Sequence, residues 1–138
     1  KKQLFKTSGG KYIAPQVIEN RMKRSPFIEQ IMVIGEGEKM PSALIQPDFE
    51  YIKNWFLKNK TNILDDFEII CGNKKLLIKI NEEIKNINKE FGDWERIKKF
   101  ELTPQVWSIE NGLLTPTMKL KRKSIIKKFI HLKEKIYN

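Results

Sequence analysis

The feature that most constrains the fold is an apolar repeat in the middle of the chain. It has steps of three and four residues and runs through Leu77, Ile80, Ile84, Ile87 and Phe91. This spacing predicts an amphipathic α-helix from about Lys75 to Phe91 that stops at Gly92. Because only one face of such a helix is apolar, it must bury that face against other elements, so the chain needs a packed core.

Shorter apolar segments surround this helix, separated by proline, glycine and other turn residues. The pattern predicts strands over residues 27–34, 40–46 and 97–102, and helices over 15–24, from 48, over 65–71 and over 117–136. Two further short strands, 4–6 and 11–13, form an N-terminal β-hairpin. Helices and strands are interspersed without a regular βαβ repeat. We therefore expect an α+β fold: a small sheet of about three strands covered by helices, with an N-terminal β-hairpin.

Length and composition favour one globular domain over residues 1–138. The chain has 138 residues, of which 40% are hydrophobic and 32% charged. A single cysteine, Cys71, excludes an internal disulfide and is expected to be a small buried residue rather than a nucleophile. With one histidine, His131, and no cysteine cluster, the sequence predicts no metal site. No apolar run is long enough to span a membrane.

The net charge of +10 favours anionic partners, which include nucleic acid, an acidic membrane surface and phosphorylated ligands. Part of this charge follows a proline-broken segment, Leu113 to Lys123. Pro116 disfavours helix at the residue before it, so a helix is expected to begin at Thr117 as N-cap. Lys119 would then stand at the root of that helix, where its ammonium could meet an anion. The alternative is a solvated lysine in a basic tail.

The other end of the chain, Lys6 to Pro15, has the pattern of a strand, a glycine turn, a second strand and a proline in the first turn of a helix. Gly9 and Gly10 permit positive φ and let another backbone or a ligand come close. The alternative is a hairpin with no ligand.

These two motifs, together with Ile109-Glu110-Asn111-Gly112, resemble the C-terminal domain of adenylate-forming acyl-CoA ligases, most closely the long-chain fatty acid–CoA ligase branch. The resemblance covers the whole chain. It implies ATP-dependent conversion of a carboxylate to an acyl-adenylate, then thioester formation with CoA. It also implies a mobile lid that rotates on a larger N-terminal adenylation domain, which is absent here and would bind ATP and Mg²⁺. Alone, this chain is expected to be inactive.

The resemblance also implies roles for single residues. Lys119 corresponds to the catalytic lysine, with Thr117-Met118 where many relatives have Ser-Gly, and Lys2 to the hinge. The hairpin residues Lys6, Gly9, Gly10 and Lys11 correspond to the loop that meets CoA or nucleotide. The basic run 121–123 would meet CoA phosphates or only solvent.

Two other functions remain open at this stage. The basic residues between Lys119 and Lys135 would also suit a nucleic-acid-binding module, although the sequence has no recognised nucleic-acid motif. The same helix could attach to an anionic membrane, which is compatible with a fatty-acid ligase. We favour the ligase domain, with a cytoplasmic location, peripheral membrane contact as an open question and no nucleic acid as partner.

Overall fold

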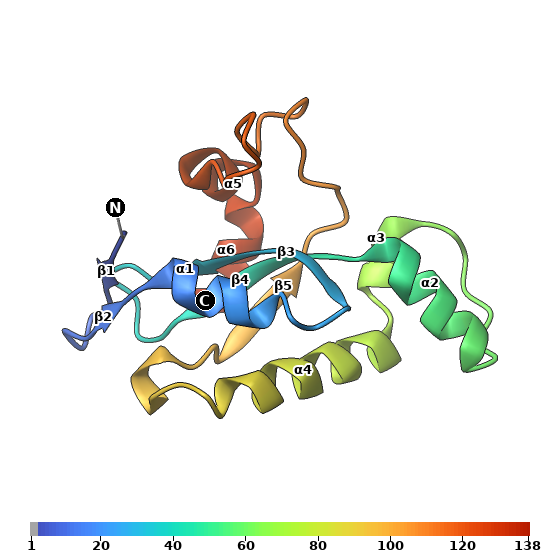
Figure 1. Ribbon diagram of the computed structural model, residues 1–138, viewed down its shortest axis with the longest axis horizontal. Coiled ribbons are helices and arrows are strands. Elements are labelled where there is room, and N and C mark those ends of the chain that lie inside the picture. Colours follow the sequence, from blue (N-terminus) through green and yellow to red (C-terminus); the bar gives the residue numbers. More distant parts are fainter. Residues whose placement is uncertain (1–2) are drawn as a thin grey trace.

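The computed structural model describes residues 3–138. The position expected to be the hinge, Lys2, therefore lies outside the described residues. The elements, in chain order, are β1 (Phe5–Lys6), β2 (Tyr12–Ile13), α1 (Pro15–Met22), β3 (Ile28–Ile34), β4 (Ser42–Pro47), α2 (Phe49–Lys58), α3 (Phe67–Cys71), α4 (Lys74–Asn88), η1 (Asp93–Glu95), β5 (Lys99–Leu102), α5 (Arg122–Lys128) and α6 (Ile130–Tyr137). Figure 1 shows their arrangement.

The main sheet has three strands in the order β3-β4-β5. Strands β3 and β4 form an antiparallel hairpin, while β5 runs parallel to β4, with Ser42 opposite Lys99 and Ile45 opposite Leu102. Parallel neighbours need a crossover connection, and here the segment containing α2, α3 and α4 supplies it. A separate two-stranded sheet joins β1 and β2. The α+β class with an N-terminal hairpin is therefore confirmed.

Alternation along β3 and β4 sends apolar side chains to both faces of this sheet. Ile31, Val33 and Ile45 belong to a core cluster shared with α1, α2, α3 and α4. Met32 and Leu44 belong to a second cluster on the opposite face, shared with α5, α6 and the segment before them. In Figure 1 the sheet lies between α4 on one side and α5 on the other.

The predicted middle helix is confirmed as α4, but its predicted end at Gly92 was wrong, because α4 ends at Asn88 with Lys89 as its C-cap residue. Three polar side chains explain where helices begin. Asp48 accepts a hydrogen bond from the Tyr51 N–H at the start of α2, Asp66 accepts from Glu68 and Ile69 at α3, and Asn73 accepts from Leu76 at α4. These side chains satisfy backbone donors that have no partner inside their helix.

The prediction of one helix from Thr117 to Ile136 was wrong. Helix α5 begins only at Arg122, after Lys121 as its N-cap residue, so Thr117 caps nothing. Met118 has a φ of 65°, in the left-handed region that a right-handed helix cannot include. Phe129, at φ −112° and ψ 30°, separates α5 from α6. Residues 117–136 therefore do not form one helix, despite their helical propensity, because a turn lies at the start of this segment and a bend in its middle.

Candidate functional site

Lys119 lies in a tight hydrogen-bonded turn that precedes α5. The backbone N–H of Thr115 donates to the Lys119 carbonyl at 2.8 Å, and the Met118 N–H donates to the Thr115 carbonyl at 2.8 Å. The Lys119 N–H donates to the Thr115 hydroxyl at 3.0 Å. Leu114 and Leu120 pair as an isolated antiparallel bridge at the base of the turn. The expected stiff base for Lys119 thus exists, but a closed turn provides it instead of a helix.

An open hollow of about 500 Å³ lies beside this turn, and Lys119 is part of its lining. One wall comes from the polar side of α1, with Gln16 and Asn20, and from its C-cap residue Lys23. Lys23 and Lys119 thus add two positive charges, and the amide side chains of Gln16 and Asn20 can donate hydrogen bonds. Such a lining suits an anion.

The only acid in that lining, Glu19, is fully engaged within the domain. Its side chain is 7% exposed and pairs with Arg122, whose two terminal nitrogens donate to the two carboxylate oxygens at 2.8 and 2.7 Å. The same carboxylate also accepts the backbone N–H of Val33 at 2.8 Å, on β3. The pair therefore connects α1, β3 and the start of α5 with short, charge-assisted hydrogen bonds.

This contact corrects one sequence-based interpretation and adds a residue that the sequence reasoning missed. Arg122 is neither a simply solvated side chain nor one left free for phosphate, because Glu19 holds both of its terminal nitrogens. Glu19 had no role in the prediction. The sequence feature that could have indicated Glu19 is its position directly after Ile18, a residue of the apolar stripe of a short helix. A solvated carboxylate is unexpected beside such a stripe.

The N-terminal hairpin carries the other predicted site residues. The Thr7 N–H donates to the Lys11 carbonyl and the Gly10 N–H to the Thr7 carbonyl, at 3.1 and 3.0 Å. Gly10 has a φ of 85°, which explains glycine there. Gly9 has no such value, and a Cβ built on it would meet nothing within 4 Å. The described part of the chain therefore contains no steric reason for glycine at position 9.

Both hairpin lysines lie over aromatic rings. Lys6 Nζ is 5.5 Å from the Tyr12 ring centroid, and Lys11 Nζ is 5.4 Å from that of Trp94. Tyr12 and Trp94 are 62% and 49% exposed, so the cations and the rings together form an outer surface. The hairpin is fixed to the β3–β4 turn, since Ser8 N–H donates to the Glu38 carbonyl at 2.8 Å.

Lys119 and the hairpin lysines do not line a common cavity in residues 3–138. The hollow beside Lys119 includes neither Lys6, Gly9, Gly10 nor Lys11. In Figure 1 the hairpin lies at the left and the loop before α5 lies at the top. The predicted residues thus form two surfaces.

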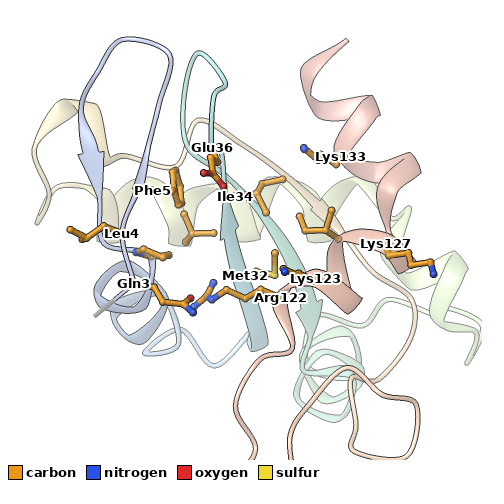
Figure 2. A pocket seen from close by; sticks show the side chains of 14 residues that line it. Gln3, Leu4, Phe5, Met32, Ile34, Glu36, Arg122, Lys123, Lys127 and Lys133 are labelled. Atoms are coloured by element: carbon orange, nitrogen blue, oxygen red, sulfur yellow. The ribbon is translucent and has the colours of Figure 1, made fainter. Parts of the chain in front are cut away.

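A second groove, of about 630 Å³, lies between the N-terminal segment and α5 and α6. Figure 2 shows Lys123, Lys127 and Lys133 across this groove from Leu4. Met32 and Ile34 of β3 provide its apolar floor.

Within the described residues, the side chains place no group of three or more His, Cys, Asp or Glu that could hold a metal ion. Over the same range, none of the helices combines the length and the apolar character that crossing a membrane requires.

Comparison with known proteins gives relatives over the full chain. The long-chain-fatty-acid–CoA ligase FadD15 of Mycobacterium tuberculosis is 34% identical over 138 residues, which is 100% of this chain and 23% of that protein. The human long-chain-fatty-acid–CoA ligase 1 is 40% identical over 125 residues, covering 88% of this chain and 18% of that protein. The chain thus spans only a minor part of the curated relatives it matches.

A solved structure shows the same fold at low identity. The adenylation domain of a carboxylate reductase from Mycobacterium chelonae matches with a TM-score of 0.78 and 20% identity, covering 97% of this chain and 19% of that one. The family described as the AMP-binding enzyme C-terminal domain matches residues 2–138. The closed Lys119 turn, the hairpin and the small mixed sheet thus occur in a chain that belongs to the AMP-binding enzyme C-terminal domain family, with long-chain-fatty-acid–CoA ligases among its relatives.

Proposed function

We propose that this chain is the C-terminal, mobile domain of a long-chain fatty acid–CoA ligase, and that its two surfaces serve two successive half-reactions. In the first, a fatty-acid carboxylate attacks the α-phosphate of ATP, which forms acyl-adenylate and releases pyrophosphate. In the second, the CoA thiol attacks the acyl carbon and AMP leaves. A larger N-terminal domain of the same polypeptide would hold ATP, its Mg²⁺ and the acyl chain.

The observation that carries this proposal is the position of Lys119. It lies on a closed turn, exposed, beside a hollow whose one acid is already paired. The adenylation transition state gathers negative charge between the carboxylate and the α-phosphate. A pre-placed ammonium stabilises that charge more strongly in a partly dry site than in water. Lys119 would play this role when the hollow closes against the N-terminal domain.

Gly9 supports a role for the hairpin in the second half-reaction. Neither backbone conformation nor crowding within the described residues requires glycine there. A partner outside this domain, such as the pantetheine arm of CoA, would explain it by passing close to the backbone. Lys6 and Lys11, with the exposed rings beneath them, would flank that path and meet phosphate or nucleotide. For the domain to present each surface in turn it must rotate, and Lys2 stays our prediction for the hinge.

The test uses the full-length ligase that contains this domain, with Lys119→Ala and Gly9→Leu made separately. Pyrophosphate release driven by fatty acid measures the first half-reaction. Thioester formation from pre-made acyl-adenylate and CoA measures the second. We expect Lys119→Ala to slow only the first, by about 10²–10³-fold, and Gly9→Leu to slow only the second.

Two matched variants make the test sharper. Lys128→Ala removes an exposed lysine of α5 that lies outside the hollow, and it should change neither half-reaction. Gly9→Ala adds one methyl group where the structure leaves open space, so its effect should be smaller than that of Gly9→Leu. If Lys119→Ala and Gly9→Leu both retained both activities, the proposal would fail, and binding of the basic helices to nucleic acid or anionic vesicles should then be measured.

A further inference from the structure

The Glu19–Arg122 pair connects the Lys119 turn to the rest of the domain. Arg122 is the first residue of α5, which begins directly after the turn. The Lys121 N–H donates to the Leu113 carbonyl at 2.9 Å, and the Ile125 N–H donates to the Lys121 carbonyl at 3.0 Å. Because these bonds join the turn to the first turn of α5, fixing the guanidinium of Arg122 fixes the backbone that carries Lys119.

Few other contacts orient the turn. Residues 116–119 are exposed, and the Lys119 backbone N–H and carbonyl form their hydrogen bonds with Thr115, within the turn itself. Leu113, Leu114 and Ile125 anchor its base in the apolar cluster on the α5–α6 face of the sheet. Apolar burial is non-directional and leaves small rotations inexpensive, whereas a two-point carboxylate–guanidinium contact fixes direction.

The partner side of the pair is equally rigid. Glu19 is buried on α1, and its carboxylate accepts a third hydrogen bond from the Val33 N–H on β3. The same helix supplies Gln16 and Asn20 to the hollow that Lys119 borders, and its C-cap residue supplies Lys23. The pair thus sets where the ammonium stands relative to the polar wall opposite it.

We propose that Glu19 and Arg122 are positioning residues for Lys119, holding its turn in the orientation that adenylation requires. This inference rests on the function proposed above for Lys119. Neither residue needs to touch substrate. A misplacement of about 1 Å in a reacting group can cost about a hundredfold in rate, so loss of the pair should act on adenylation in particular.

The test uses the full-length ligase with Glu19→Gln and Arg122→Lys, with Glu90→Gln as matched control. Glu90 also pairs with arginines, Arg21 and Arg24, but on the surface and away from the turn. The measurements are kcat and KM for pyrophosphate release with ATP and fatty acid, and the rate of thioester formation from pre-made acyl-adenylate.

We expect Glu19→Gln to lower the kcat of adenylation by about 10–100-fold while KM and thioester formation stay within about twofold. Arg122→Lys keeps the charge and loses the planar two-point contact, so its loss should be smaller in the same half-reaction. Glu90→Gln should change neither. Retained thioester formation in the same preparation also shows that the variant domain is folded.

The outcomes separate the two proposals. A normal adenylation rate in Lys119→Ala would overturn the function proposed for Lys119. A slow Lys119→Ala beside a normal Glu19→Gln would overturn only the positioning role. Equal loss of both half-reactions in Glu19→Gln would make the pair merely structural. If Glu19→Gln does not fold, Arg122→Lys decides by the same criterion: selective loss of adenylation supports positioning, and equal or absent losses overturn it.

Discussion

At Gly35 the absence of a side chain has a clear cause. This buried residue follows β3 and has a φ of +142°. A Cβ there would lie 2.9 Å from the Met40 carbonyl oxygen and 3.1 Å from the Pro41 Cα. Both neighbours are backbone atoms just before β4. Neither can move without disturbing the antiparallel pairing of β3 with β4.

We therefore predict that Gly35→Ala lowers the free energy of unfolding by about 2–4 kcal/mol, through backbone strain and overpacking together. Gly37→Ala is the control, because Gly37 also has positive φ, +72°, but open space around it. It should cost only about 1 kcal/mol. Urea unfolding of the domain followed by circular dichroism measures both, and equal losses would show that crowding at Gly35 is unimportant.

Cys71 gives a pH-dependent prediction. Burial, with a smaller effect of the Glu68 charge, raises the pKa of its thiol from 9.0 to about 12. Above pH 9 the unfolded chain therefore loses this proton while the folded chain keeps it, so the cysteine contributes stability that declines as pH rises from 9 toward 12. Below pH 9 its contribution should be constant.

The measurement compares the free energy of unfolding at pH 8 and pH 10 in the original domain and in Cys71→Ala. The two proteins differ only at position 71, so the difference between the two slopes isolates the thiol. The original domain should lose more stability between these pH values than Cys71→Ala. Parallel slopes would mean that the thiol ionises in the folded domain as it does in the unfolded one.

At the scale of single elements, α4 depends on its first polar residue. Asn73 accepts the Leu76 N–H at 3.0 Å through its side chain. Asn73→Ala should cost about 1 kcal/mol in the free energy of unfolding because that donor loses its partner. Asn81→Ala, in the exposed middle of the same helix, should be neutral or slightly stabilising, since alanine has the higher helix propensity. If thermal unfolding showed Asn81→Ala to be more destabilising than Asn73→Ala, the Asn73 side chain would not stabilise α4 as its N-cap.

Elements set by local pattern could be predicted from the sequence, and those set by distant contacts could not. The repeat that begins at Leu77 is local, and α4 forms there, although it ends at Asn88, before Phe91. The prediction of one last helix over 117–136 was wrong because Met118 has a left-handed backbone conformation and Phe129 forms a bend, although the surrounding residues favour helix. The parallel pairing of β5 with β4 joins segments far apart in sequence, so no short pattern contains it.

The candidate site divides in the same way. Lys119, Gly9 and Gly10 could be named from the motifs that carry them. The Glu19–Arg122 pair joins residues 103 positions apart, and neither residue type alone indicates a partner. The pair can be recognised only in the folded structure, where α1, β3 and α5 lie next to one another.

On the scale of the whole molecule, one thin sheet supports both cores. Alternate residues of β4 point to opposite faces: Ala43 and Ile45 to the cluster with α4, and Leu44 to the cluster with α5 and α6. If either α4 or the pair α5 and α6 detached from the sheet, one apolar face of the same strands would be exposed to water. We therefore expect the Lys119 turn and the N-terminal hairpin to belong to one folding unit, as the proposed rotation of this domain would require.

This arrangement predicts that damage on either face destabilises the whole domain. Ile84→Ala in one cluster and Ile125→Ala in the other should each cost about 2–5 kcal/mol. Each should lower the hydrogen-exchange protection of the Leu44 and Ile45 amides by the same free energy that urea unfolding reports, because those amides would open only when the whole domain unfolds. Ile78→Ala on α4, where the side chain is 61% exposed, is the control and should stay within about 0.5 kcal/mol. The contrary result is that Ile125→Ala destabilises α5 and α6 and leaves the protection of β4 unchanged. In that case α5, α6 and the Lys119 turn would form a separate unit that could unfold while the sheet and the N-terminal hairpin stay folded.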